Sequence, residues 1–496
     1  SSVAADFQPR RTAGCRSASE IIQEHQGQLV ADYIADQIHR QSAAVDLSFY
    51  EDHHYHNTLY RAQQEAPHRP VSIVLSLTQV GQSLISLLAL AGLLFYLHWL
   101  IPLLLFAAVL PGIVIKIYHS EQLYKWKAHR TGTERKAYEY HWMLTTIFYA
   151  KELRLFDLGA LFRERYRKLM AVLREEKLNL TKSRAKYVLL AQAGGFLALY
   201  GMLAFVATQA LRGLITIGDM VMYYQAFQRA QTALQDIMSG LAGLYEDSLF
   251  LNYLYVFLDL KPNVTTSLQP TPLPRPMQRG VTFENVSFRY PSSERDVIRG
   301  LNLHIKPGEV VALVGDNGCG KTTLAKLLCR LYDPTWGRIT IDGTDFRELD
   351  IHGLRREITV IFQDYNHYPL TARENIWVGD TRVDPASERI DQAARQSGAD
   401  TVISGLSQGY DTMLGKHLVK GAEVSIGEWQ KIALSRAFLR DAQLIILDEP
   451  TSAISVRAEQ EIFQSFKQLL NGRSALLISH RFSTVHMADV NCVMEG

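Results

Sequence analysis

A long stretch without charged residues lies in the first half of the chain. Residues 70–115 contain no Asp, Glu, Lys or Arg. A helix rises about 1.5 Å per residue, so this stretch can form two helices of roughly 20 residues that each cross a bilayer. Core helices of soluble proteins are rarely so long and so free of charge. The stretch therefore predicts a membrane protein, with a turn between two spanning helices near His98, Trp99 and Pro102.

Two further segments enlarge the expected membrane part. Residues 187–211 are uncharged and long enough to span a bilayer, and a weaker span follows that is broken early by Asp219. Residues 119–186 carry sixteen Lys or Arg against eight Asp or Glu, a bias that places this segment in the cytoplasm. We therefore expect a multi-pass protein of the cell (inner) membrane, in contact with the lipid bilayer. The expected spans are 71–97, 99–118, 187–211 and 214–235, about four in all.

The second half of the chain contains a phosphate-binding motif. The sequence GDNGCGKTT, at 315–323, matches the pattern G-x-x-G-x-G-K-[ST] at every fixed position. The glycines allow backbone N–H groups to point at phosphate oxygens, and the helix expected to start near Lys321 adds the positive end of its dipole. Lys321 is expected to reach the β- and γ-phosphates, and Thr322 to hold Mg²⁺. The residues expected at the nucleotide here are Gly315, Asn317, Gly318, Cys319, Gly320, Lys321, Thr322 and Thr323.

Two adjacent carboxylates follow a second apolar strand, at 444–447. Asp448 is placed to bind Mg²⁺ through water, and Glu449 to polarise an attacking water. Further motifs lie in a fixed order around these two. They are Tyr290 before Pro291, Gln363 in the run IFQD, the segment VSIGEWQ at 424–430, and Ser479-His480-Arg481 after an apolar run.

This order of motifs resembles the nucleotide-binding domain of the ATP-binding cassette (ABC) family, over about residues 280–496. The resemblance implies that Tyr290 stacks on the adenine of ATP and that Gln363 contacts Mg²⁺ and the attacking water. It also implies that Glu449 is the catalytic base and that His480 contacts the γ-phosphate. In this family Mg²⁺ is the cofactor of ATP, and the resemblance assigns it to Thr322, Gln363 and Asp448.

The resemblance also implies a partner chain. The segment with Ser425, Gly427 and Glu428 would close over the ATP held by a second half-transporter, because a helix start with a serine offers N–H groups to an anion. The partner is a second copy or a related chain, and the sequence does not decide between a homodimer and a heterodimer.

The resemblance predicts the fold class. It is an α-helical transmembrane domain of the ABC exporter type, followed by an α/β P-loop nucleotide-binding domain with a helical subdomain. Residues 46–52 and 151–162 resemble the coupling loops that dock on the nucleotide-binding domain. The expected parts are an atypical N-terminal segment at 1–20, a transmembrane domain at 21–261, a proline-rich linker at 262–279 and the nucleotide-binding domain at 280–496.

Several departures from the family pattern keep two functions open. The expected four membrane helices are fewer than the six of an exporter half, and Ser455 stands where the family has aspartate. The leading interpretation is an ATP-driven half-transporter that exports a substrate, which the sequence does not identify. The alternative is a truncated or regulatory membrane protein that binds ATP without transport. The net charge of +2 gives no sign of nucleic-acid binding, and the uncharged stretch at 70–115 argues against a soluble ATPase.

Overall fold

The chain forms two compact units. The computed structural model describes residues 3–65, 69–97, 99–415, 421–449, 464–470, 472–479 and 485–495. The first unit comprises Ser1–Val45 and Asp52–Lys261, and the second comprises Asp46–Glu51 and Pro262–Gly496. The first unit thus ends at the residue before the predicted linker, whereas the short segment Asp46–Glu51 groups with the second unit although it lies inside the predicted membrane domain.

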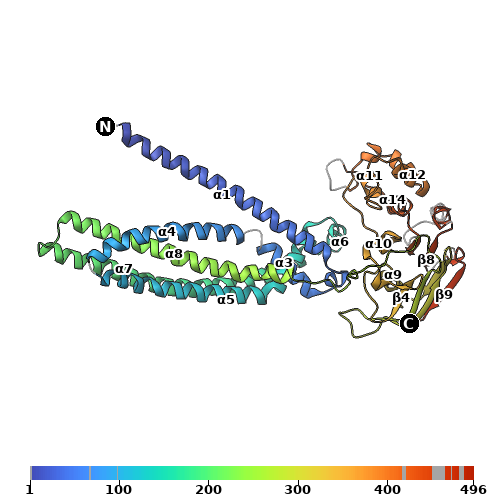
Figure 1. Ribbon diagram of the computed structural model, residues 1–496, viewed down its shortest axis with the longest axis horizontal. Coiled ribbons are helices and arrows are strands. Elements are labelled where there is room, and N and C mark those ends of the chain that lie inside the picture. The colour runs from blue at the N-terminus through green and yellow to red at the C-terminus, as the bar shows by residue number, and fades with distance from the viewer. Residues whose placement is uncertain are drawn as a thin grey trace. The chain divides into compact units, whose positions relative to one another are not determined.

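The regular elements described in the first unit are all helices. Four of its helices, α4, α5, α7 and α8, run side by side in Figure 1. Apolar side chains of these four helices form a common core that includes Leu94, Leu105, Val206 and Phe227. The helices are α1 (Val3–Ala44), α3 (His53–Glu65), α4 (Arg69–Leu97), α5 (Leu100–Thr145), α6 (Ala150–Leu155), α7 (Gly159–Leu211) and α8 (Ile217–Leu258).

Three helices in the described residues are long and apolar enough to cross a membrane. They lie at Arg69–Tyr96, Ile101–Thr145 and Gly159–Leu211, and so cover nearly all of the first three predicted spans. The fourth predicted span, 214–235, falls in α8, which is not among them. Asp219 and Arg229 lower the apolar character of α8, and many of its side chains are buried in the bundle. A fourth span therefore stays a prediction.

The outward faces of the three apolar helices suit a lipid environment. Large aliphatic side chains stand exposed there, and in water so large an apolar surface would be unfavourable. In a bilayer the same side chains contact hydrocarbon. Examples are Ile85, Leu88, Leu103, Leu190 and Leu197.

A single helix covers the start of the chain. α1 runs without a break from Val3 to Ala44 and so includes most of the segment 1–20, whose atypical character stays a prediction. The predicted turn near Trp99 is present, because α4 ends at Leu97 and α5 starts at Leu100. His98 lies outside the described residues.

The second unit contains two sheets and a group of helices. An antiparallel sheet has the order β2-β1-β4-β5, and a parallel sheet has the order β6-β7-β8-β3-β9. All residues of β7 and β8 are buried, as is typical of parallel strands with both faces covered. The strands are β1 (Val281–Phe288), β2 (Ile298–Ile305), β3 (Val310–Gly315), β4 (Trp336–Ile341), β5 (Thr344–Asp345), β6 (Ile358–Ile361), β7 (Leu444–Asp448), β8 (Ser474–Ile478) and β9 (Val490–Met494).

The helices of the second unit divide into two groups. α9 packs with the sheets, whereas α11, α12, α13 and α14 share a separate core around Ile390, Ala394 and Ile432. This separate core forms the predicted helical subdomain. The helices are α2 (Leu47–Tyr50), α9 (Lys321–Leu328), α10 (Ile351–Arg356), α11 (Ala372–Trp377), α12 (Glu388–Ser397), α13 (Ala399–Ser404) and α14 (Ile426–Leu439), with short 3-10 turns at η1 (Phe346–Glu348) and η2 (Gly409–Asp411).

Candidate functional site

The carboxyl ends of three neighbouring strands bring the predicted residues together. β7, β8 and β3 are parallel neighbours, with Leu313 of β3 opposite Ile478 of β8. Ligands of open α/β sheets bind at this edge. The phosphate loop begins where β3 ends at Gly315, and the two carboxylates lie where β7 ends at Asp448. The fold therefore places motifs far apart in sequence at one edge of the parallel sheet.

The glycines of the phosphate loop meet specific backbone requirements. Gly318 and Gly320 have φ angles of 87° and 101°, in the left-handed region that favours glycine. A Cβ at Gly320 would also lie 3.1 Å from the carbonyl oxygen of Val297, and one at Gly315 would collide with the carbonyl oxygen of Met494. The loop can take this shape only with glycine at these positions.

Lys321 closes the loop on itself. Its ammonium donates to the carbonyl oxygens of Gly315 and Asp316, each at 2.8 Å, and its side chain is only 6% exposed. The sulfur of Cys319 lies 3.9 Å from the same nitrogen, while Asn317 is exposed at the tip of the loop. The positive charge of Lys321 is thus held inside the loop that is expected to receive phosphate.

Asp448 is a buried carboxylate without a hydrogen-bond partner among the described residues. It is 1% exposed, and neither oxygen accepts a hydrogen bond of normal geometry there. Burial raises the pKa of Asp448, the nearby Thr322 hydroxyl opposes this, and the charge of Glu449 adds to the increase. A buried carboxylate close to a hydroxyl fits a hard cation with oxygen ligands. The residues predicted to hold Mg²⁺ therefore suit that ion.

Gln363 and Glu449 are in direct contact. The amide nitrogen of Gln363 donates to a carboxylate oxygen of Glu449 at 3.2 Å. Glu449 has a φ of 46°, and its backbone N–H donates to the carbonyl oxygen of Ile478 at 2.8 Å. A left-handed non-glycine residue is uncommon and is often found at functional sites. The strand end thus holds the carboxylate of Glu449 beside Gln363.

A cavity of about 1040 Å³ opens beside this group. Thr322, Gln363 and Asp448 line it together with basic side chains such as Arg436. The structure therefore brings together, around one cavity, the three residues predicted to hold Mg²⁺.

Tyr290 lies at the other side of the phosphate loop. Its hydroxyl is 2.9 Å from the hydroxyl oxygen of Thr323, and its ring packs edge-on against Phe288 and Tyr332. The ring is thus held by protein contacts in this structure. Its role in stacking on adenine stays a prediction.

The predicted signature residues lie at the start of α14 and do not line this cavity. Ser425 caps the helix in a reciprocal arrangement, in which its backbone N–H donates to the carboxylate of Glu428 at 2.6 Å. Gly427 has open space around its α-carbon, and Ile426 beside it is 58% exposed. The helix start is therefore accessible from outside. His480 and Ser455 lie outside the described residues.

One contact near the nucleotide site was missed by sequence reasoning. In the second unit, the carboxylate of Glu51, just after α2, accepts a hydrogen bond from Lys326 of α9 at 2.9 Å. The same ammonium lies 5.3 Å from the ring centroid of Tyr290. Residues 46–52 resemble a coupling loop, but no local sequence pattern indicates that Lys326 contacts it. Lys326 comes five positions after Lys321, which was the available clue.

Comparisons with known proteins decide the family. Residues 298–452 match the ABC transporter family. The chain is 31% identical over 460 residues to the subtilin transport ATP-binding protein SpaT of Bacillus subtilis, covering 92% of this chain and 74% of that protein. The chain belongs to the ABC transporter family. Its resemblance to the exporter type, first suggested by the order of motifs, is confirmed.

Two other relatives of this ABC transporter chain are a transport ATP-binding protein and an ATP-dependent flippase. The nisin transport ATP-binding protein NisT of Lactococcus lactis is 29% identical over 92% of this chain and 76% of its own length. An ATP-dependent lipid A-core flippase of Syntrophus aciditrophicus is 34% identical, over 60% of this chain and 48% of its own.

A solved structure confirms the fold class of the ABC transporter chain. A bacterial Atm1-family ABC exporter with ATP bound superimposes with a TM-score of 0.83, covering 97% of this chain and 82% of that one at 23% identity. The chain is therefore a multi-pass membrane protein with a helical N-terminal region and a C-terminal nucleotide-binding domain.

Proposed function

We propose that the chain is an ATP-driven half-transporter that pairs with a second half, binds two ATP molecules at shared sites and exports a substrate across the inner membrane. Its nucleotide-binding domain would face the cytoplasm. The observation that supports this most is the buried carboxylate of Asp448, which lacks a hydrogen-bond partner among the described residues and shares a cavity with Thr322 and Gln363. Such a group is costly in a folded protein unless a ligand compensates for it.

The residues of the site divide the chemistry between them. The backbone N–H groups of the phosphate loop and the ammonium of Lys321 would hold the phosphates of ATP. Mg²⁺, held by Thr322, Asp448 and Gln363, would neutralise charge on those phosphates. Glu449 would accept the proton of the attacking water, and Gln363, which already contacts Glu449, would orient that water.

The position of the signature residues supports a two-chain site. Ser425, Gly427 and Glu428 lie at the accessible start of α14 and are absent from the lining of the cavity that contains Thr322 and Asp448. The N–H groups at a helix start bind anions. The phosphates that they contact would be those of the ATP held by the partner chain.

The relatives bear on the substrate only by their names. Two of them are named for the transport of subtilin and nisin, and a third for flipping the lipid A core. We therefore propose that the exported substrate is a peptide or lipid with a large apolar part.

Glu449→Gln separates hydrolysis from binding. In the full chain reconstituted in liposomes, the rate of ATP hydrolysis should fall by about 10²- to 10⁴-fold, the usual loss of a general base. ATP affinity should stay within about threefold, because Glu449 does not belong to the phosphate loop, and trapped ATP should hold two chains together in native mass spectrometry. Glu388→Gln, on the exposed start of α12, is a matched control and should leave hydrolysis unchanged.

Two results would count against the proposal. Undiminished hydrolysis in the Glu449→Gln chain would show that the assigned base is wrong. Normal hydrolysis in the unmodified chain, without transport of any tested peptide or lipid into inside-out vesicles, would instead favour the regulatory protein that binds ATP and does not transport.

A further inference from the structure

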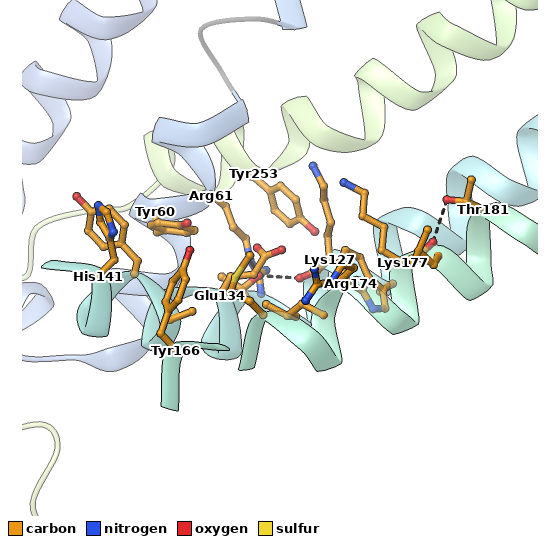
Figure 2. A pocket seen from close by; sticks show the side chains of 17 residues that line it. Tyr60, Arg61, Lys127, Glu134, His141, Tyr166, Arg174, Lys177, Thr181 and Tyr253 are labelled. Carbon is orange, nitrogen blue, oxygen red and sulfur yellow. Dashed lines mark hydrogen bonds between the residues drawn. The ribbon is translucent and has the colours of Figure 1, made fainter. Parts of the chain in front are cut away.

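A second large cavity lies in the first unit, remote in sequence from the nucleotide motifs. It has a volume of about 900 Å³ and lies between α3, α5, α7 and α8, as Figure 2 shows. Its α5 residues lie between 126 and 141 and its α7 residues between 166 and 181. These ranges follow the predicted span 99–118 and precede the predicted span 187–211. The cavity thus lies in the part of the helices that is expected to be in the cytoplasm.

Positive charge dominates the lining of this cavity. Four basic side chains line it, and the carboxylate of Glu134 is the single acidic group among its lining residues in the described part of the chain. A cavity with an excess of one charge attracts ligands of the other sign. The basic residues are Arg61, Lys127, Arg174 and Lys177, which are labelled in Figure 2.

Neutral groups contact two of these cations and help to fix their positions. The guanidinium of Arg61 donates to the hydroxyl of Thr131 and to the carbonyl oxygen of Ala128, each at 2.7 Å. The ammonium of Lys127 lies 4.7 Å from the ring centroid of Phe250. Contacts with neutral groups, including the Tyr253 ring at 4.9 Å, fix the guanidinium of Arg61 without neutralising its charge.

The other two cations are exposed on α7. Within the part of the chain that the structure describes, Arg174 and Lys177 form no ion pair. The nearby carboxylate of Glu176 is already engaged, because it accepts hydrogen bonds from Arg130 at 2.8 Å and from Trp126 at 2.9 Å. Both cations are therefore available to an anion in the cavity.

Aromatic and aliphatic side chains complete the lining. The aromatic rings of Tyr60, Tyr166 and Trp126 line the cavity, as does the buried aliphatic side chain of Leu173. Burial raises the pKa of Tyr60, and the charge of Glu134 raises it further, so the Tyr60 hydroxyl stays protonated and can donate to an anion. Rings beside cations suit a ligand that combines an apolar body with a negative group.

We propose that this cavity is a cytoplasmic-side binding site for an organic anion that carries a phosphate or carboxylate group on an apolar or aromatic body. Arg174 and Lys177 contact the negative group, and the rings from α3 and α7 contact the apolar body. The site goes beyond the proposed ATP-driven function, because its occupation requires no nucleotide.

Two pairs of probes test the site and distinguish its possible ligands. Binding to the full chain in phosphatidylcholine nanodiscs is measured without nucleotide, because ADP and ATP are themselves aromatic phosphates that could enter the cavity. The soluble pair is 1-naphthyl phosphate and the uncharged 1-naphthol. The lipid pair is dihexanoyl phosphatidic acid and dihexanoyl phosphatidylcholine. We expect at least one anionic probe to bind, and its affinity to fall as salt is added. Its neutral counterpart should bind at least tenfold more weakly.

Variants on α7 show whether the anion occupies this cavity. The double variant Arg174→Gln with Lys177→Gln should weaken binding by about 10- to 100-fold, because hydrogen bonds between charged groups are lost. The matched control is Arg167→Gln with Lys168→Gln, which removes the same charge from exposed residues of α7 outside the cavity and should change binding less than twofold.

The outcomes separate clearly. Binding of the lipid probe alone identifies a lipid headgroup as the ligand, and binding of the naphthyl probe alone identifies a soluble anion. Equal binding of charged and neutral probes, an equal effect of both double variants, or no binding by either anion would overturn the assignment. None of these results depends on ATP hydrolysis, so failure of this site leaves the proposed transporter function untouched.

Discussion

Asp448→Asn should stabilise the second unit when Mg²⁺ and nucleotide are absent. The wild-type carboxylate is buried and has no hydrogen-bond partner among the described residues. An unsatisfied buried polar group costs about 1–3 kcal/mol, and a charged one costs more. Asparagine has nearly the same shape as aspartate and carries no charge, but its buried amide also needs hydrogen-bond partners. The free energy of unfolding at neutral pH should therefore rise by about 1–2 kcal/mol.

The gain in the free energy of unfolding from Asp448→Asn should depend on pH in a defined direction. Burial raises the pKa of Asp448 in the folded protein. Below the ordinary aspartate pKa of about 3.9, the carboxyl is protonated in both the folded and the unfolded chain, so it carries no penalty. As the pH rises, the unfolded chain loses its proton first, and wild-type stability falls until the folded pKa is passed. The advantage of Asp448→Asn should therefore be absent in strong acid, grow as the pH increases and then level off.

Hydrogen exchange of the full chain in nanodiscs measures this effect locally. Amides of β7 and β8 should exchange about 5- to 30-fold more slowly in the variant without Mg²⁺, as a gain of 1–2 kcal/mol requires. Mg²⁺ with ATP should protect these amides in the wild-type chain and add little in the variant. Glu388→Gln, at an exposed carboxylate of α12 away from this cavity, is the control. Faster exchange in the variant, or equal protection by Mg²⁺ and ATP in both chains, would refute the reasoning.

Three other predictions concern the phosphate loop and its neighbours. Alkylation of Cys319, which is buried in the loop, should proceed slowly, block ATP turnover and be prevented by bound ATP. Peptide mass spectrometry locates the alkylated residue, and full ATP turnover after alkylation of Cys319 would contradict the prediction. Gly320→Ala should destabilise the protein by about 1–2 kcal/mol and weaken ATP binding, because alanine tolerates a φ of 101° poorly. Gly405→Ala, at a glycine with a φ of −79°, should cost less in the same thermal unfolding measurement. Lys326→Met and Glu51→Gln should each lower ATP turnover stimulated by substrate. Turnover of the double variant should match that of either single variant, which corresponds to a coupling energy of about 0.5–1 kcal/mol between the two side chains. Additive losses of turnover would rule out a shared contact.

Local sequence patterns predicted the parts of the site that depend on short segments. The phosphate loop is fixed by glycines at positions where the backbone turns, so Gly318 and Gly320 could be read directly. Asp448 and Glu449 were predictable for a similar reason, since they end an apolar strand. In each case a few consecutive residues determine the geometry.

Features that depend on tertiary packing could not be predicted in this way. The contact between Glu51 and Lys326 joins residues 275 positions apart and has no local pattern. The basic cavity combines side chains from four helices, so no segment of the sequence indicates it. The helix α1 begins at Val3, within the segment expected to be atypical, because helix formation does not require an apolar sequence.

The length of α7 has a mechanical consequence. It contains 53 residues and no proline, and the portion at 159–186, before the predicted span, is about 40 Å long at the usual rise per residue. An uninterrupted helix of this kind transmits a rotation as a stiff rod. A tilt of about 5° within the bilayer would move its far end, next to α6, by about 3–4 Å. A small tilt of α7 within the membrane therefore moves its far end by enough to make or break contacts there, well away from the bilayer.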